Sequence, residues 1–326
     1  MTTTGPLITL DRLRAFGARR QGLGGPGFAS VTEAVLGTGG VYGSSPTCYL
    51  SLAARIEGFV LADLDRELYD TRAVVRLRAQ RQMAYVQPVG ELPMFLAAAR
   101  PGPKGVPTVL RQMGAEYADY EAAANRVEAV MTGREPMSVA EIRAELDEEH
   151  LRLVVALMTR ETRLVRTRPR GSWRSDGYGY ARWSDWVGEP VAELGEAAAR
   201  TDLARRYLSV LGPATPADLR WWAGWTAGET KAALAALAGE TTPVRLQYPD
   251  GDAEALVLSA DLPELEDAAP LSGVRLLPMW DAYPMGHKDR RRIVAPDRHG
   301  QVIDPVGNAT SMILAEGEAA GVWQGD

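Results

Sequence analysis

The stretch Gly212-Pro-Ala-Thr-Pro-Ala-Asp-Leu-Arg-Trp-Trp-Ala-Gly-Trp-Thr-Ala-Gly-Glu229 carries the strongest fold signal in this sequence. Thr215 is typical of a helix N-cap, and Pro216 suits the first helical position because its fixed φ and missing N–H cost nothing there. Gly224 predicts a turn. Thr226 and Glu229 then have the spacing of a capping box, which starts a second helix. The stretch therefore predicts a helix-turn-helix.

The residues after this motif predict a β-rich C-terminal part. Apolar runs at 244–248, 255–258 and 274–277 have strand composition. Residues 191–326 are therefore expected to form a winged-helix unit followed by further strands. Helical spacing turns the tryptophans of the motif toward neighbouring helices, which favours core packing over base stacking. These residues are Trp221, Trp222 and Trp225.

Residues 106–190 predict a second winged-helix unit. A Gly-Pro linker, Pro101 to Pro107, precedes it, and Ser138 with Glu141 has capping-box spacing. An apolar helix is expected after His150, followed by a hairpin with strands near 164–165 and 178–180. The hairpin is rich in arginine, which favours either a solvated loop tip or contacts with DNA phosphates. The arginines concerned are Arg166, Arg168, Arg170 and Arg174.

Residues 1–105 predict the first unit. Thr9 is an N-cap candidate, and Ser30 with Glu33 predicts a helix that ends where glycines begin at Gly37. The glycine-rich stretch 38–45 is expected to be a loop or a short extended piece before a helix at 48–56. The predicted fold class is therefore α+β, with three tandem winged-helix units around a concave channel.

Composition limits the classes of function. The chain has 326 residues, 46% of them hydrophobic, and a formal charge of -6, so no overall electrostatic attraction to nucleic acid is expected. Cys48 is the only cysteine, which excludes an internal disulfide and a multi-thiolate zinc cluster. No bilayer-spanning run or secretory signal is visible, and arginine greatly outnumbers lysine. We expect a cytoplasmic, monomeric, actinobacterial protein without metal or cofactor.

Several stretches together resemble the winged-helix alkyl-DNA glycosylases of the AlkZ type. The similarity covers nearly the whole chain. Its most specific part is the stretch Ala204 to Trp222, which includes the helix-turn-helix. The remaining matches are Leu52 to Ile56, Val74 to Arg76, Leu276 to Tyr283, Gly286 to Arg290, Pro305 to Asn308 and Gly321 to Trp323.

The resemblance implies excision of alkylated purines from DNA, in some members as self-protection of antibiotic producers. The family signature, Gln, an apolar residue, then Gln or Asp, falls here on Val41-Tyr42-Gly43. Neither Val41 nor Gly43 can orient a water or stabilise charge on a sugar. The family's Arg-Gly-Thr-Leu-His is replaced by Arg81-Gln-Met-Ala-Tyr85. These departures indicate altered function.

Other polar groups are candidates for the chemistry of this cleft. Phenols and a carboxylate can donate or accept protons if a partly apolar site shifts their pKa values. The candidate catalytic residues are Tyr42, Tyr85, Asp281 and Tyr283, although for the last two the hydrogen-bonded support of a loop is the favoured interpretation. Candidate cleft-lining residues are Val41, Gly43, Ser44, Gln82 and His287, with His287 on a surface loop. Gln80, Gln82 and Gln87 are candidate substitutes for the missing glutamines.

Two functions follow. In the first, the scaffold is a small-molecule enzyme of natural-product biosynthesis that performs acid/base cyclisation, dehydration or hydration. In the second, its partner is duplex DNA, either as an unusual glycosylase or as a lesion-binding protein for antibiotic self-resistance. A transcription regulator is a weaker third reading, because sequence readers commonly bind paired half-sites as dimers. The sequence favours the small-molecule enzyme, because the glutamines are absent and the net charge is acidic.

Overall fold

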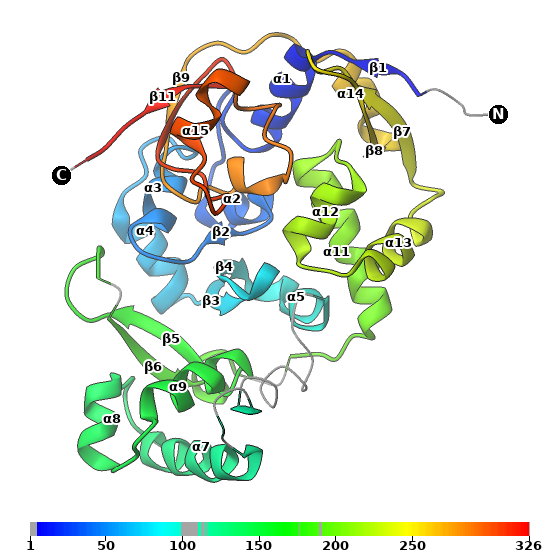
Figure 1. Cartoon of the computed structure of the whole chain (residues 1–326). Coiled ribbons are helices and arrows are strands. Elements are labelled where there is room, and N and C mark those ends of the chain that lie inside the picture. Colours follow the sequence, from blue (N-terminus) through cyan, green and yellow to red (C-terminus); the bar gives the residue numbers. More distant parts are fainter. Residues whose placement is uncertain are drawn as a thin grey trace.

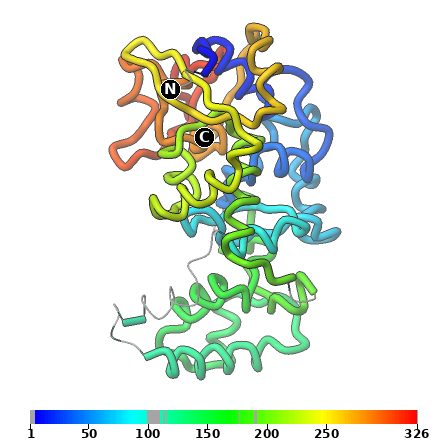
Figure 2. The backbone as a smooth tube through the Cα atoms, turned by 90° about the vertical axis from the view of Figure 1, so that its right-hand side faces the viewer, coloured from blue at the N-terminus to red at the C-terminus, as the bar shows by residue number. Residues whose placement is uncertain are grey.

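The computed structural model describes residues 5–98, 110–111, 114, 116–175, 177–188 and 191–325. Figure 1 shows two bodies, with residues 117–188 forming a lower one beneath a larger upper body. The upper body combines the first part of the chain with everything after residue 191, and the side view in Figure 2 shows the same arrangement. The Gly-Pro linker at 101–107 lies outside the described residues. The unit boundaries at 105 and 190 stay a prediction.

The third unit contains the predicted helix-turn-helix. It consists of α11 (Glu196–Leu211), α12 (Pro216–Ala223), α13 (Ala227–Ala236) and the hairpin β7 (Thr241–Leu246) and β8 (Ala253–Leu258). Both capping boxes form, since Thr215 accepts from the Asp218 amide and Thr226 from that of Glu229. Gly224 has a φ of 75°, a left-handed conformation that glycine adopts without steric cost. The predicted motif is confirmed.

The N-terminal residues pack against the third unit. Strand β1 (Leu7–Ile8) pairs with β7 in parallel, and helix α1 (Leu10–Arg20) follows. Thr9 is at its N-cap but its side chain makes no capping hydrogen bond. Leu13 and Phe16 share a core with β7 and β8. The first residues therefore pack against strands that come more than 200 positions later in the sequence.

The middle unit follows the predicted order of three helices and a hairpin. It contains α7 (Tyr117–Met131), α8 (Val139–Glu145), α9 (Leu151–Arg160), β5 (Leu164–Pro169), β6 (Tyr178–Arg182) and α10 (Trp183–Trp186). The capping box of Ser138 and Glu141 is formed. The hairpin register shifts between Arg166 and Pro169. This order is consistent with a winged helix.

The first unit surrounds a three-stranded sheet in the order β2-β4-β3. Ser30 caps α2 as predicted. The glycine-rich stretch contains the short strand β2, as the expectation of a loop or extended piece allowed. The elements are α2 (Val31–Thr38), β2 (Val41–Tyr42), α3 (Thr47–Ala53), α4 (Leu61–Asp65), the π-helical turn η1 (Arg66–Asp70), β3 (Val74–Arg78), the 3-10 turn η2 (Gln80–Gln82), β4 (Ala84–Pro88) and α5 (Leu92–Ala98).

The C-terminal part forms a second three-stranded sheet with the order β11-β10-β9. Its elements are α14 (Leu262–Glu266), β9 (Val274–Leu277), α15 (His299–Val302), β10 (Met312–Ala315) and β11 (Glu318–Val322). Between β9 and α15 lies an irregular loop, residues 278–298, most of which is buried. The chain thus has the mixed helix and sheet content that the α+β prediction requires.

The bodies meet around the sheet of the first unit. Tyr42 and Tyr85 share a hydrophobic core with α11 and α12 of the third unit. On the other side, Val75 and Leu77 pack with Val165 of the middle unit. The β2-β4-β3 sheet therefore lies between the third unit on one side and the middle unit on the other. No helix within the described ranges is long and apolar enough to cross a membrane.

Candidate nucleic-acid interface

The Val41-Tyr42-Gly43 segment is a packed strand and not an open loop. Val41 has no exposed surface and belongs to the core of the first unit. Tyr42 pairs in register with Tyr85 on β4. A Cβ atom added at Gly43 would lie 3.1 Å from backbone atoms of Ala84 and Tyr85, so the approach of β4 leaves little room for a glutamine there. The close approach of β4 therefore explains why glycine, and not glutamine, occupies position 43.

Tyr42 lies in an aromatic cluster. Its ring centroid is 5.0 Å from that of Trp280 and 5.8 Å from that of Tyr85. Burial, and then the Tyr85 phenol, raise the pKa of Tyr42, whereas a hydrogen bond with Ser44 and the charges of Arg81 and Arg78 oppose the rise. The phenol is therefore neutral at physiological pH. It can donate a hydrogen bond or stack on a base, but it cannot act as a base itself.

Asp281 is tied into a fully buried ion pair. Arg55 donates to both of its carboxylate oxygens at 2.7 Å, and the Ser51 hydroxyl donates at 2.6 Å. Neither Arg55 nor Asp281 has exposed side-chain surface. The neighbouring Tyr283 is buried in the C-terminal core, where burial raises its pKa to about 12. The structure therefore places both residues away from solvent, in supporting positions.

The expectation that His287 lies on a surface loop is wrong. The side chain is 1% exposed, and Nε2 lies 2.7 Å from the carbonyl oxygen of Leu211. Burial, followed by the charge of Arg292, lowers the pKa of His287 to about 3. The ring is therefore neutral and joins the 284–292 loop to α11. This loop packs into the C-terminal core, and Asp218 accepts hydrogen bonds from its backbone at Lys288 and Asp289, contacts that the local sequence does not reveal.

The candidate glutamine substitutes are mostly committed to backbone contacts. The amides of Gln80 and Gln87 both donate to the Gly39 carbonyl, at 3.0 and 3.3 Å, and both residues are fully buried. Gln82 is half-buried and has a φ of 60°. Gln80 and Gln87 therefore hold the start of β2 in place and are not oriented toward solvent.

Two wing arginines are paired with acidic residues. Arg168 lies 3.1 Å from Asp65 and 3.7 Å from Asp70, and Arg170 lies 3.0 Å from Glu141. Both arginines line a groove of about 860 Å³ between the first and middle units, whose walls carry charges of both signs. Arg174 stacks on the adjacent Trp173 at 5.4 Å. The outer wing is thus a surface of mixed charge.

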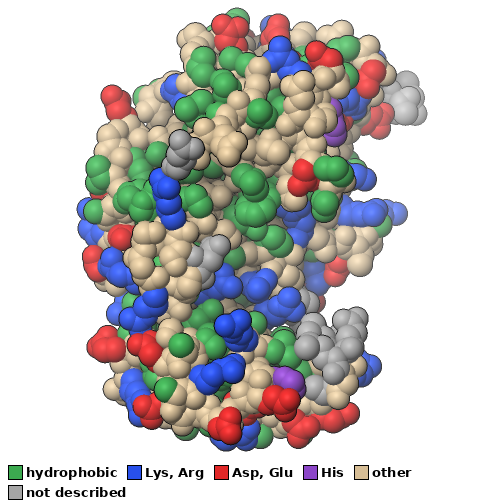
Figure 3. All heavy atoms as spheres, turned by 60° about the vertical axis from the view of Figure 1, so that its left-hand side comes forward, with side chains coloured by type: hydrophobic (Ala, Val, Ile, Leu, Met, Phe, Trp, Pro, Cys, Tyr) green, Lys and Arg blue, Asp and Glu red, His purple; other side chains and the backbone are tan. Residues whose placement is uncertain are grey.

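Arg166 has different surroundings, although it lies on the same strand. Burial, and then the charges of Arg160 and Arg166, lower the pKa of Arg78. The three arginines come from β3, α9 and β5, which pack together. Among the described residues neither Arg78 nor Arg166 forms an ion pair. In Figure 3 apolar side chains occupy the middle of one face, and Lys and Arg side chains form a band below them, where the two bodies meet.

We refer to Arg78, Arg160 and Arg166 as the joint cluster. Arg78 lies close enough to Tyr42 for each charge to affect the other's pKa. The sequence prediction named only Arg166 of this set, since Arg78 and Arg160 lie outside the wing. The alternation in Val74-Val-Arg-Leu-Arg78 could have indicated an outward arginine, but not what it would face. Within the described ranges no group of three or more His, Cys, Asp and Glu residues is arranged to hold a metal ion.

Comparisons with known proteins agree with this architecture. The family model for AlkZ-like DNA glycosylases matches residues 38–326. An interstrand DNA cross-link repair glycosylase from Streptomyces sahachiroi is 28% identical over 142 residues, which cover 43% of this chain and only 37% of that protein. The structure of the Streptomyces sahachiroi DNA glycosylase AlkZ superposes with a TM-score of 0.79 at 20% identity, over 97% of this chain and 88% of that chain, and so has the same fold. The match of the family model over most of the sequence shows that the chain belongs to the AlkZ-like DNA glycosylase family.

Proposed function

We propose that this protein binds duplex DNA along the joint cluster and recognises modified bases at the Tyr42–Trp280 aromatic cluster, with little or no release of the base. The observation that carries the proposal is the convergence of Arg78 and Arg166, together with Arg160, from two units onto one surface. Family membership gives the expectation of a DNA partner. The joint cluster supplies a place for its phosphates.

Phosphate binding at the joint cluster is expected because Arg78 and Arg166 form no ion pair among the described residues. Burial, and then the charges of Arg160 and Arg166, lower the pKa of Arg78, and like charges held close together repel each other. A phosphodiester oxygen would remove that repulsion, and arginine binds phosphate oxygens in a bidentate way. The acidic net charge does not oppose this interaction, because a local basic surface acts over about one Debye length. Wing residues Arg168 and Arg170 already have acidic partners.

The argument for slow base release rests on the groups around Tyr42. Excision of a base requires a group that orients water and one that stabilises developing charge. Val41 and Gly43 supply neither, and the phenol of Tyr42 is neutral. Loss of one preorganised polar group costs about 100-fold or more in rate. A protein that binds a lesion without excising it fits this site better than an efficient glycosylase.

The named relative supports a protective role. It is a glycosylase that repairs interstrand DNA cross-links, and this chain matches about a third of its length. Shielding of adducted DNA in the cytoplasm, by a monomer and without a cofactor, is part of the proposal. The small-molecule enzyme receives less support than the sequence suggested, because two of its candidate acid/base groups, Asp281 and Tyr283, are buried in structural contacts.

The test is a binding titration combined with a base-release assay. Purified protein is titrated into a labelled plain duplex and into the same duplex treated with an alkylating agent, and binding is followed by fluorescence anisotropy. We expect binding to both at low salt, tighter to the alkylated duplex, and base release at least about 100-fold slower than with an active glycosylase run in parallel. Absence of binding to either duplex would overturn the proposal. Rapid release of alkylated bases would show that the protein is an active glycosylase instead.

A further inference from the structure

Two guanidinium groups stack on one indole beside Tyr42. The guanidinium carbon of Arg81 lies 4.0 Å from the ring centroid of Trp221, and that of Arg290 lies 4.6 Å from it. Arg81 is on the η2 turn between β3 and β4, Trp221 is on α12, and Arg290 is on the 284–292 loop. Elements of the first and third units therefore place two positive charges on the same aromatic ring.

Neither guanidinium forms an ion pair among the described residues, although Arg290 Nη2 donates to the Gly307 carbonyl at 3.2 Å and the more distant charges of Asp218 and Asp289 partly oppose the lowering of the Arg290 pKa. Arg81 Nε and Arg290 Nη1 are buried atoms without a hydrogen-bond partner in the described part of the chain. Burial, and then the charge of Arg81, lower the pKa of Arg290 to about 10. The next residue is a useful contrast, because Arg291 contacts both Asp289 and Asp250. Buried unpaired cations are costly, so their retention calls for an anionic ligand.

The backbone holds Arg81 in a conformation that non-glycine residues rarely adopt. Its φ is 51°, and those of Gln82 and Trp280 are 60° and 61°. Such strained residues concentrate at functional sites, where the surroundings enforce them. Gly224 is part of these surroundings, because a Cβ atom there would lie 3.2 Å from the Arg81 Cα.

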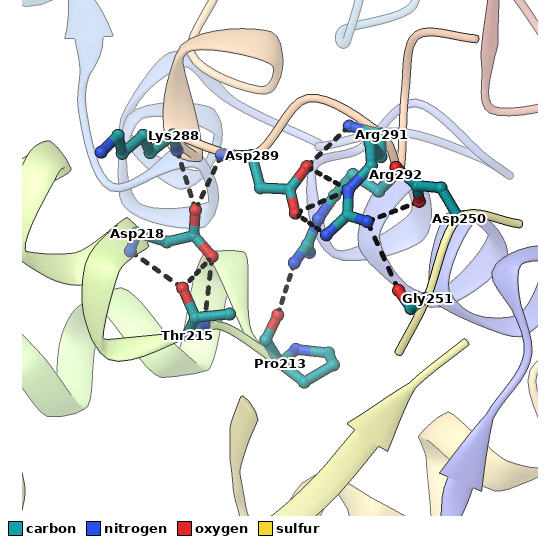
Figure 4. A network of polar contacts seen from close by, with 9 residues as sticks. All are labelled: Pro213, Thr215, Asp218, Asp250, Gly251, Lys288, Asp289, Arg291 and Arg292. Atoms are coloured by element: carbon teal, nitrogen blue, oxygen red, sulfur yellow. Dashed lines mark hydrogen bonds and ion pairs between the residues drawn. The ribbon is translucent and has the colours of Figure 1, made fainter. Parts of the chain in front are cut away.

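Asp218 anchors the backbone that precedes Arg290. One oxygen of this buried carboxylate accepts from the backbone amides of Lys288 and Asp289, at 2.9 and 3.0 Å. The other oxygen accepts from the amide and hydroxyl of Thr215, so the carboxylate that completes the capping box of α12 also anchors the loop (Figure 4). Trp221 lies one turn further along α12. The same helix therefore sets the positions of the indole and of Arg290.

We propose that Arg81 binds the phosphodiester group next to a modified nucleotide that is drawn out of the duplex toward Tyr42 and Trp280. The inference rests on the proposed function and assigns a phosphate subsite to it. Arg81 is half-buried and its charge acts on the Tyr42 phenol, so a phosphate bound there lies beside the aromatic cluster. Trp221 and the 6% exposed Arg290 are positioning residues that hold Arg81 in its strained conformation. A regular duplex engages the joint cluster but does not bring a phosphate to this recessed group.

The experiment compares Arg81→Gln with Arg78→Gln on two DNA probes. One probe is a plain duplex, and the other is the same duplex with a single bulged nucleotide, which leaves the stack at low cost. We expect Arg81→Gln to leave the plain-duplex Kd within about twofold and to weaken binding of the bulged probe about tenfold, because one phosphate contact is lost. Arg78→Gln should weaken both probes. Arg81→Lys, which keeps the charge without the planar fork, should fall between wild type and Arg81→Gln on the bulged probe.

The outcomes separate the two proposals. If the wild type binds neither probe, the proposed function and the subsite both fail. If Arg78→Gln weakens both probes while Arg81→Gln binds the bulged probe as the wild type does, the subsite alone is overturned. An equal loss on both probes with Arg81→Gln would also overturn it, because Arg81 would then be one more contact to regular DNA. Thermal unfolding of each variant checks that the fold is kept, and Arg81→Lys retains the stacking if Arg81→Gln does not fold.

Discussion

Arg166 of the joint cluster and Arg168 of the outer wing lie on the same strand, β5, yet their surroundings differ. Arg166 faces Arg78 and Arg160 at the junction of two units, whereas Arg168 and Arg170 face carboxylates. An arginine paired with an acid has its charge satisfied within the protein. One that is gathered with other arginines retains its attraction for an external anion. The contact partners of an arginine, and not its position in a wing, therefore indicate its role.

The largest expected effect belongs to a paired arginine that is also buried. Arg55→Met removes the partner of Asp281 and leaves a carboxylate without exposed surface uncompensated. We expect the free energy of unfolding to fall by about 3–5 kcal/mol. Urea denaturation followed by circular dichroism measures it. A loss below about 1 kcal/mol would show that Asp281 finds other partners and would weaken the distinction between paired and unpaired arginines.

Charge reversal in the joint cluster comes next. We expect Arg78→Glu with Arg166→Glu to weaken binding to plain duplex DNA about 100-fold, since two attractive contacts become repulsive. Neither residue loses an ion pair among the described residues, and only the hydrogen bond of Arg78 to the Gln82 carbonyl and the contact of Arg166 with the Tyr178 ring are removed, so the melting temperature should fall only slightly. Anisotropy titration and differential scanning fluorimetry give the two values. Unchanged DNA affinity in the folded variant would refute the assignment of the joint cluster.

The third prediction uses pH and concerns the network that holds Arg290. His287 faces Asp218, Arg292, Arg290 and Tyr207 and is neutral in the folded state because burial lowers its pKa to about 3. The unfolded histidine takes up a proton below about pH 6.5, so the free energy of unfolding falls as the pH decreases. From pH 7 to pH 5 we expect a contribution of about 2 kcal/mol. His287→Gln, which keeps an N–H for the Leu211 carbonyl, should lose this contribution.

Denaturation at a series of pH values measures this difference between His287→Gln and the wild type. His299→Gln provides the control, because it removes an exposed histidine without disturbing a buried contact. If the free energy of unfolding of the wild type falls no more steeply with decreasing pH than that of His287→Gln, the buried neutral His287 is not the source of the pH dependence.

The smallest effect is expected at the outer wing. The ion pairs of Arg168 and Arg170 lie at the surface, where each is worth about 0–1 kcal/mol. Arg168→Gln with Arg170→Gln should therefore leave both the melting temperature and the DNA affinity almost unchanged. The two assays used for the joint cluster check this. A loss of affinity as large as that of the joint-cluster variant would remove the contrast between the two regions.

Much of the fold could be predicted from local signals. The capping residues Ser30, Ser138, Thr215 and Thr226 mark helix starts, and each bonds the backbone amide three residues on. Such signals involve neighbours in sequence, so a single chain reveals them. The pairing of β1 with β7 joins residues that are far apart in the sequence, and no local pattern predicted it.

The candidate site was less predictable because its contacts join distant residues. Tyr42 meets Trp280, and His287 is buried through Asp218, across more than 60 positions in each case. The register shift after Arg166 also separates it from Arg168, which regular alternation would place on the same face. The sequence could therefore suggest which residues take part in the site. Their burial and their contact partners depend on how the units pack together.

The salt dependence of the affinity for plain duplex DNA is the sharpest test of the joint cluster, because it reports the phosphate contacts that an interface makes. Three contacts give a slope of about -2.7 in a plot of log K against log salt concentration, or about a 40-fold loss between 50 and 200 mM. We predict this slope for the wild type and for Arg168→Gln with Arg170→Gln, and a slope near about -1 for Arg78→Gln with Arg166→Gln. Equal slopes for the two double variants, or no binding of the wild type at low salt, would contradict the account.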